Sequence, residues 1–393
     1  MDIIMNQVSD TNFYPAGFKS VSLNLGIKDK TKDFLCVYST APCTASGVFT
    51  QSRFAGPSVE ISRSHINDGR AQAIVAISKN ANVATGLQGK KDAEIIVNFV
   101  SSTLGIKPSD VLIASTGVIG KRYPMEKIIS KLSNFDSLMV DGGFEDGAEA
   151  IMTTDTVPKI SFCEIGNGKL VGIAKGVGMM EPNMATLFAF FFTDVKIEGS
   201  ELDKIFKNVM DRTFNCLSID TDTSTSDSAV ILSNGLSGNA DHKEFESALY
   251  KVSESLVKSI AKDGEGATKL IQVNVKGAES YIQAKKVAKS IVNSPLVKTA
   301  VHGEDPNWGR VAMAIGKCED EASINSEKTS ISFCGIEVYP RPVTEKELHD
   351  LEVRLKNDEI SIDVDLGVGH NIATVWGCDL SSEYVRINGE YTT

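Results

Sequence analysis

The sequence lacks the short motifs of the common catalytic and nucleotide-binding folds. It has neither the GxSxG of an α/β-hydrolase serine nor the GxxxxGK[ST] of a phosphate-binding P-loop. It has no HExxH and its five histidines are scattered, so we expect no histidine-based metal site and no metal or other cofactor. GNGKLVG (166–172) has the wrong spacing for a GxGxxG motif, and it predicts a hairpin turn instead.

Cysteine is sparse, and its spacing fits neither a disulfide framework nor a metal site. The chain has seven cysteines, an odd number, and no two of them form a CxxC pair. This usage is typical of reduced, mostly buried thiols in a cytosolic protein. The cysteines are Cys36, Cys43, Cys163, Cys216, Cys318, Cys334 and Cys378.

Positive charge is in deficit, and long apolar runs are missing. The formal net charge of −11 argues against nucleic acid or an anionic membrane as a partner. The longest apolar run, LFAFFF (187–192), is far shorter than the roughly 20 residues that span a bilayer. The first residues, MDIIMNQVSDTNFY, lack the basic and apolar regions of a secretory signal. We therefore expect a cytoplasmic protein with no membrane partner.

What is present is a mixture of short β-rich runs and helical periodicities, which predicts an α+β fold in layers. Strands are expected at 33–40, 71–78, 110–116, 228–233, 270–276, 329–334 and 359–365, as a hairpin at 159–175, and as a strand buried on both faces at 186–195. Helices are expected near 90–104, 200–216, 243–262, 278–291 and 343–356.

The most suggestive chemistry lies in KGVGMMEPNMATLFAFF (175–191), where a glycine-rich loop leads through Ala185 and Thr186 into an apolar strand. If the chain is cut before Thr186, the new α-amine, with a pKa of roughly 7.7–8, can act as the base for the neighbouring hydroxyl. The ordinary alternative is a β-branched residue at the start of a buried strand, and composition alone favours it.

A second candidate is ASTGVIG (114–120), which follows an expected strand. Thr116 and Gly117 would leave backbone N–H groups and one hydroxyl accessible, as an oxyanion hole requires. An ordinary turn at the end of a strand explains the same residues, and alone it is the better interpretation.

Three further segments are dense in polar residues, and each has an ordinary explanation. SIDTDTSTSDSA (218–229) is also typical of a solvated loop or a capped helix start, and DGEGATKL (263–270) of a tight turn. NSPLVKTAVHGEDPNWGR (293–310), which includes Lys298 and His302, is also typical of a surface loop that opens a helix near Trp308. Spacing alone assigns no chemistry to them.

Together these segments resemble the ornithine acetyltransferase (glutamate N-acetyltransferase) family of arginine biosynthesis over essentially the whole chain. PNMAT and DPNWGR are specific, whereas Glu181 departs from the small residue that many members have there. The matching segments, in the family's order, are NANVATG (80–86), STGVIG (115–120), AIMTTDT (150–156), KGVGMMEPNMAT (175–186), DGEGATK (263–269), the 293–310 segment and NGEYTT (388–393).

The resemblance implies that the chain cleaves itself between Ala185 and Thr186, into fragments of 185 and 393 − 185 = 208 residues. We therefore expect a fragment 1–185 that carries the oxyanion segment and a fragment 186–393 that starts at the nucleophile, with a smaller subdomain at about 280–393. The implied fold is an α/β sandwich, similar to but distinct from N-terminal-nucleophile hydrolases. Two copies of each fragment would assemble.

The implied mechanism is ping-pong transfer of acetyl from N-acetylornithine to glutamate. Thr186 is the nucleophile, and Thr116 and Gly117 stabilise the oxyanion. The substrate contacts implied by the matching motifs are Thr153, Lys175, Thr186, Glu265, Asn388 and Thr393, and Thr154 is the alternative to Thr153.

Three other functions stay open at this point. The enzyme could also use acetyl-CoA as a donor, or it could be a self-processed N-terminal-nucleophile amidase or aminopeptidase that transfers the acyl group to water. The third is a binding protein that never cleaves. The sequence also does not separate primary arginine biosynthesis from a secondary-metabolite paralogue.

Overall fold

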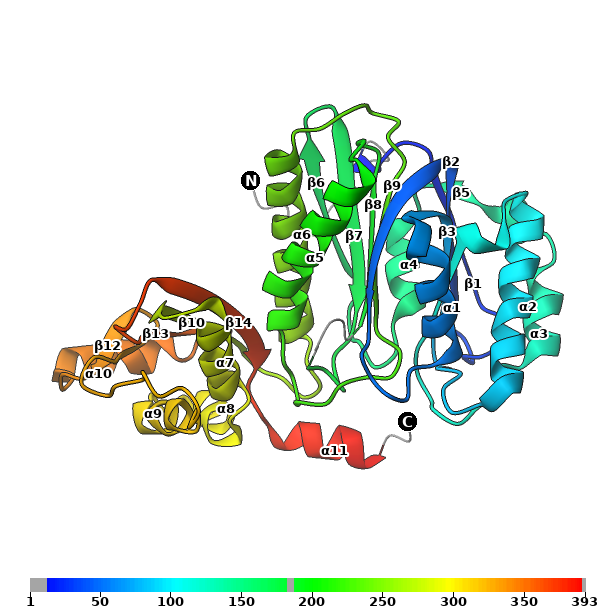
Figure 1. Ribbon diagram of the computed structural model, residues 1–393. Helices are drawn as coiled ribbons and strands as arrows, with labels where there is room; N and C mark the ends of the chain where they lie inside the picture. Colours follow the sequence, from blue (N-terminus) through cyan, green and yellow to red (C-terminus); the bar gives the residue numbers. More distant parts are fainter. Residues whose placement is uncertain (1–12, 182–186, 391–393) are drawn as a thin grey trace.

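The computed structural model describes residues 13–181 and 187–390. Two β-sheets, each covered by helices, lie side by side (Figure 1). The larger sheet has the strand order β4-β3-β2-β9-β8-β7-β6, with β1 paired to β2 and β5 paired to β1. The smaller sheet has the order β12-β11-β13-β10-β14. This layered mixture of helices and mixed sheets confirms the predicted α+β class.

The strands of the larger sheet are β1 (Phe18–Leu23), β2 (Phe34–Phe49), β3 (Arg70–Ile77), β4 (Val111–Ser115), β5 (Val140–Asp141), β6 (Lys159–Ile165), β7 (Gly168–Lys175), β8 (Phe188–Thr193) and β9 (Ser228–Ser233). Those of the smaller sheet are β10 (Leu270–Ala278), β11 (Ser330–Phe333), β12 (Ile336–Tyr339), β13 (Glu359–Asp365) and β14 (Asn371–Cys378).

The helices are α1 (Pro57–His65), α2 (Gly86–Leu104), α3 (Met125–Leu132), α4 (Phe144–Ile151), α5 (Gly199–Arg212), α6 (His242–Lys262), α7 (Tyr281–Val292), α8 (Pro295–His302), α9 (Trp308–Gly316), α10 (Glu345–Arg354) and α11 (Ser382–Glu390). Among the described residues, no helix is both long and apolar enough to cross a membrane.

Strand β8 is an inner strand of the larger sheet, and both of its faces are buried, as its apolar run predicts. Its side chains alternate in direction. Phe191 meets Phe206 of α5 on one face, and Phe192 stacks on Phe144 of α4 on the other. β8 lies between β7 and β9, antiparallel to the first and parallel to the second. The helices α5 and α4 therefore form the layers on the two sides of the sheet.

The two sheets share one apolar core, which fixes the smaller sheet against the larger one. Buried residues of α5, α6, α7, β10 and β14 belong to the same cluster as Phe191 of β8. The chain leaves β14 and returns as α11 below the ends of the larger sheet (Figure 1). Residues near the C-terminus are thereby brought to the same edge as the loops of the larger sheet.

Most predicted elements are present, and the differences are local. Strand 33–40 is the first half of β2, which runs on to Phe49 through a register shift between Tyr38 and Cys43. The predicted start of helix 278–291 is wrong, because β10 extends to Ala278 and α7 begins at Tyr281. The strands β1, β5, β12 and β14 were not predicted. The short helices α1, α3, α4, α8 and α11 were not predicted either, since two turns give little periodicity.

All seven cysteines lie within the described residues and none forms a disulfide. Five are buried, while Cys163 and Cys334 are partly exposed. Their expected state as mostly buried free thiols is confirmed.

Candidate active site

A cavity of about 160 Å³ lies where several loop segments meet α11. Its walls come from the turn after β4, the loops after α4, β7 and α6, and the segment before β9. The residues singled out from the sequence that line it are Thr116, Gly117, Thr153, Lys175, Glu265 and Asn388. Thr154 also lines it, so both candidate threonines of that loop face the same space.

The predicted oxyanion pair lies in a turn with tightly fixed backbone. Thr116 follows β4, and its N–H donates to the carbonyl of Ile77. The N–H of Val118 donates to the carbonyl of Lys79. Gly117 has φ +125°, and a Cβ there would lie 2.3 Å from the Lys79 carbonyl carbon. Glycine is therefore required, since any side chain would collide with backbone.

The predicted oxyanion pair has two hydrogen-bond donors to offer, the hydroxyl of Thr116 and the N–H of Gly117. The Thr116 N–H is used within the sheet, so it is not available as the sequence had suggested. Thr116 Oγ1 accepts a hydrogen bond from Lys175 Nζ at 2.7 Å, which leaves its own proton to donate elsewhere. The Gly117 N–H makes no hydrogen bond to another described residue. Together they can act on a carbonyl oxygen in the cavity.

Lys175, the last residue of β7, is a buried cation at the cavity wall. Its side chain lies 5.5 Å from the centroid of the Phe188 ring, and the residue is 8% exposed. Burial lowers the pKa of Lys175, and the carboxylates of Asp155 and Asp227 oppose this effect only in part. While it is protonated, Lys175 can bind an anion, and because its pKa is lowered it can also give up its proton and take part in proton transfer.

A buried ion network lies behind the cavity and holds two of its loops. Asp155 Oδ1 accepts from Lys159 Nζ and from the Gly176 N–H, both at 2.8 Å, and Oδ2 accepts from the Thr153 N–H at 3.0 Å. Lys159 Nζ also donates to Asp263 at 2.7 Å. Burial alone would raise the pKa of Asp155, but the cations of Lys159 and Lys175 hold it below its usual value. The Thr153 and Gly176 loops are thus tied to one charged centre.

The opposite wall joins α11 to the loop after α6. Asn388 Nδ2 donates to Glu265 Oε2 at 2.9 Å, and the Glu265 N–H donates to the carbonyl of Val177 at 2.9 Å. Gly178 packs so closely that a Cβ there would lie 2.4 Å from Glu265 Oε2. Glu265 and Asn388, distant in the sequence, therefore form one polar pair at the cavity.

Asp220 and Tyr384 are among the cavity residues to which the sequence had assigned no role. Asp220 accepts the N–H groups of Met179 and Met180, each at 2.7 Å, and the Tyr384 hydroxyl at 3.3 Å. Asp220 falls in the polar segment 218–229, whose density was a usable signal. Tyr384 gave no such signal, because it reaches the cavity only through the position of α11 beside the loops of the larger sheet.

Ala185, Thr186 and Thr393 lie outside the described residues. The described residues on both sides of this gap, Glu181 and Leu187, are fixed by backbone hydrogen bonds. Glu181 donates its N–H to the Asp222 carbonyl at 2.7 Å, and the Leu187 carbonyl accepts from Ser228 at 2.9 Å. Phe188, two residues after Thr186 in the sequence, pairs with Lys175 in the β7–β8 register.

A model of the ArgJ family matches residues 19–393. The chain is 57% identical over 379 residues to the arginine biosynthesis bifunctional protein ArgJ 2 of Nostoc sp., covering 96% of this chain and 98% of that protein. It is 52% identical over 385 residues, at the same coverages, to the glutamate N-acetyltransferase Oat2 of Streptomyces clavuligerus. A crystal structure of argJ from Bacillus halodurans is 39% identical, covers 52% of this chain and 98% of that chain, and gives a TM-score of 0.47.

Proposed function

Because the chain belongs to the ArgJ family of arginine biosynthesis transferases, we propose that it moves an acetyl group from N-acetyl-L-ornithine to L-glutamate. The products are ornithine and N-acetylglutamate. The name of the Streptomyces relative, a glutamate N-acetyltransferase, supports this reaction. The observation that carries the proposal is that residues from five separate segments, each singled out by its motif, line a single cavity.

The first step is self-cleavage at Ala185–Thr186. The Thr186 hydroxyl oxygen attacks the Ala185 carbonyl carbon, the C–N bond breaks, and an ester forms. Water then hydrolyses the ester, leaving a carboxylate on Ala185 and a free amine and hydroxyl on Thr186. The chain becomes a fragment 1–185 and a fragment 186–393. The free amine is the base that later activates the hydroxyl.

The second step is transfer through an acetyl-threonine. The Thr186 hydroxyl attacks the acetyl carbonyl of N-acetylornithine, ornithine leaves, and the amine of glutamate then takes the acetyl group from Thr186. The Thr116 hydroxyl and the Gly117 N–H are the donors that suit the tetrahedral oxyanion. The contact between Lys175 and Thr116 supports this role, since it turns the Thr116 proton away from Lys175.

The remaining residues bind the two substrates. Lys175 is the cation for a substrate carboxylate, and Glu265 is the anion for a substrate ammonium group. Asn388 and Thr393 hydrogen-bond the α-carboxylate, and Thr153 contacts the substrate from the opposite loop. The buried position of Lys175 strengthens such an ion pair, because little water screens it.

We also propose that the two fragments stay together, that two copies of each assemble, and that the enzyme works in the cytoplasm without a cofactor. Free, mostly buried thiols support a reducing compartment. A smaller C-terminal subdomain at about 280–393 is also proposed, and it is supported by the smaller sheet, four of whose five strands fall in that range.

The proposal is tested by a denaturing gel, N-terminal sequencing and a transfer assay on the same preparations. Active wild-type protein is expected to give fragments near 185 and 208 residues, the second starting at Thr186. Thr186→Ala is expected to stay uncut and inactive, and Thr186→Ser to keep part of both activities. An active protein that consists of one uncut chain would rule the mechanism out.

A second donor is the closest alternative. The Nostoc relative is named a bifunctional protein, which favours a further activity beside acetyl transfer from ornithine. Formation of N-acetylglutamate with acetyl-CoA as the sole donor would show it. Comparing release of free acetate with and without glutamate separates both readings from an amidase, which would transfer the acyl group to water.

A further inference from the structure

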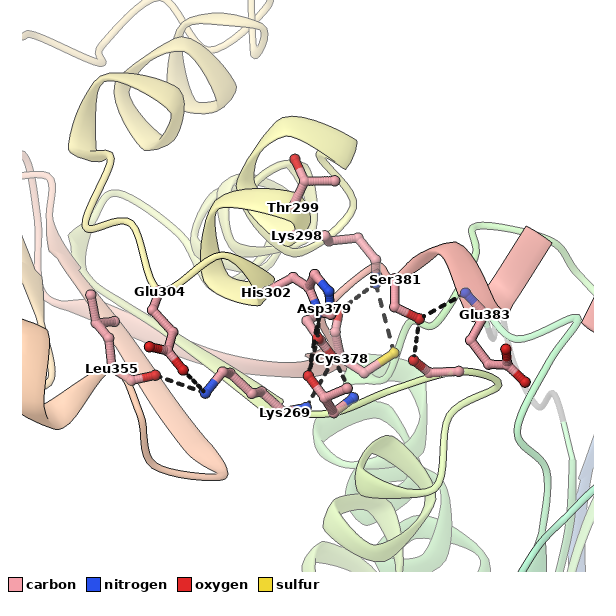
Figure 2. A network of polar contacts seen from close by, with 12 residues as sticks. Lys269, Lys298, Thr299, His302, Glu304, Leu355, Cys378, Asp379, Ser381 and Glu383 are labelled. Carbon is pink, nitrogen blue, oxygen red and sulfur yellow. Dashed lines mark hydrogen bonds and ion pairs between the residues drawn. The ribbon is translucent and has the colours of Figure 1, made fainter. Parts of the chain in front are cut away.

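The 293–310 segment belongs to the family pattern, yet none of its residues lines the cavity. It follows α7 directly and forms helix α8 and the start of α9. Three of its polar residues, Asn293, Lys298 and His302, each contact a chain segment that does lead to the cavity. Figure 2 shows the contact of Lys298 with Cys378 and that of His302 with Asp379.

Lys298 joins two of these segments through one nitrogen atom. The residue is 5% exposed, and its Nζ donates to the carbonyl of Ile219 at 2.9 Å and to that of Cys378 at 2.5 Å. Ile219 precedes Asp220, which holds the loop after β7. Cys378 ends β14, and α11 follows four residues later. Buried carbonyls are costly to leave without a donor, so this contact is expected to be firmly kept.

Asn293 and His302, on either side of Lys298 in the sequence, also contact segments that lead to the cavity. Asn293 Nδ2 donates to Glu181 Oε2 at 2.5 Å, four residues before the proposed cleavage bond. His302 Nδ1 lies 2.7 Å from Asp379 Oδ2, next to Cys378. The 293–302 stretch therefore contacts the loop after β7, the segment before β9 and the segment that leads into α11.

Helix α11 depends on such contacts because it has almost no apolar anchorage. None of its residues is buried. It is held by polar contacts of its own, Asn388 to Glu265 and Tyr384 to Asp220, and by Ser381, whose hydroxyl donates to the Gly266 carbonyl at 2.6 Å. Segments with few buried apolar contacts open at low free energy, so the fixed point at Cys378 matters more here than in a core helix.

We propose that Lys298 is a positioning residue of this site: by binding the Ile219 and Cys378 carbonyls together, it holds α11, with Tyr384 and Asn388, against the Asp220 segment. The inference rests on the proposed function, because it assigns the wall that α11 forms to substrate binding. Lys298 does not touch the reacting atoms. It fixes the position of the residues that bind substrate.

Lys269 offers a matched control in the same network (Figure 2). It is 7% exposed, and its Nζ donates to the carbonyls of Leu355 at 2.8 Å and Asn357 at 3.3 Å. Neither of these carbonyls belongs to a segment that lines the cavity. Lys269→Met therefore removes the same kind of buried donor from the smaller sheet without releasing α11.

The test compares Lys298→Met, Lys298→Arg and Lys269→Met by hydrogen–deuterium exchange and by steady-state transfer kinetics. In Lys298→Met, amides of residues 380–390 are expected to exchange about tenfold faster, and KM for both substrates to rise about tenfold with kcat changed less than about threefold. Lys298→Arg should recover part of the protection, because it keeps a donor. Lys269→Met should leave the exchange of 380–390 and both KM values as in the wild type.

Unchanged exchange of α11 in Lys298→Met, or an equal rise of KM in Lys269→Met, would overturn the inference. If Lys298→Met does not fold, Lys298→Arg serves instead, because it keeps a donor but moves it away from the position of the lysine nitrogen. There, exchange of 380–390 must still exceed that of Lys269→Met. A wild-type enzyme without acetyl transfer would defeat the proposed function, whereas the exchange of α11 would still decide the role of Lys298.

Discussion

Gly117 illustrates how a single backbone position can decide the chemistry of the site. Its φ of +125° and the Lys79 backbone 2.3 Å from a would-be Cβ leave no room for a side chain. The N–H that we propose for stabilising the oxyanion belongs to this same residue. The conformation of the turn and its proposed role in binding the oxyanion therefore both depend on Gly117.

Gly117→Ala is expected to lower both cleavage and transfer rates about a hundredfold or more, because the turn must shift and move a donor. Gly105→Ala is the control, since Gly105 also has a positive φ, +68°, but no atom lies within 4 Å of its would-be Cβ. The control should cost only about 1–2 kcal/mol of stability. Gel-based cleavage rates, transfer assays and thermal melts measure both variants. Wild-type cleavage in Gly117→Ala would contradict the assignment.

Lys175 makes stability depend on pH in a known direction. Burial lowers its pKa below the 10.5 of an ordinary lysine. As the pH rises from this lowered pKa toward 10.5, the unfolded chain holds a proton that the folded chain has released, so the contribution to stability rises with pH. Lys175→Met lacks this titration. The free energy of unfolding of the parent minus that of the variant should thus increase toward alkaline pH.

Urea denaturation between about pH 7 and pH 10 measures this difference. Both proteins should carry Thr186→Ala, so that an uncut chain unfolds in each case. Two pH profiles that run parallel would show that Lys175 keeps an ordinary pKa.

The Asp155–Lys159–Asp263 network joins the start of β6, the loop before it and the segment after α6. Lys159 starts β6, Asp155 lies just before it, and Asp263 follows α6. The side chains of Asp155 and Lys159 are buried almost completely, so water contributes little to their solvation. Such a centre holds the strand and the helix end in place only while both signs of charge are present.

Lys159→Met is expected to lower the free energy of unfolding by about 3–5 kcal/mol, because two buried carboxylates lose their cation. Lys207→Met removes the exposed pair between Lys207 and Asp203 on α5 and should cost no more than about 1 kcal/mol. Urea denaturation in the Thr186→Ala background compares the two. Equal losses would mean that burial adds nothing to the importance of the network.

In the whole molecule, the proposed cut falls within one continuous sheet. Strands β1 to β7 precede the cut, whereas β8 and β9 follow it. β8 pairs with β7, and β9 pairs with the second half of β2. The sheet therefore contains strands of both fragments, and cleavage removes none of these pairings.

The fragments are accordingly expected to co-elute after cleavage, with a mass per copy of about 42.3 kDa, and to separate only in denaturant. Size-exclusion chromatography with light scattering gives the native mass, and it also tests the proposed assembly of two copies of each fragment. A denaturing gel of the same fractions shows the cut. Separate native peaks for the two fragments would contradict this prediction.

The sequence predicted the long elements well and the short ones poorly. The β6–β7 hairpin, the doubly buried β8 and the long α6 appear where their patterns indicated, because local periodicity and turn residues suffice for them. Helix α8 was missed, although Ser294 caps its first turn and Pro295 stands at its first position. Eight residues carry too little periodicity to outweigh a polar loop.

For the site, motifs in the sequence singled out Thr116, Gly117, Lys175 and Glu265, which line one cavity, since each belongs to a distinctive local segment. The sequence could not reveal that Asp220 meets Tyr384, or that Lys298 binds both Ile219 and Cys378. These partners lie more than 70 residues apart, and only the packing of the smaller sheet and the return of α11 bring them together. Residues that are neighbours in the sequence determine the chemistry of each loop, whereas packing of the tertiary core determines which loops come together.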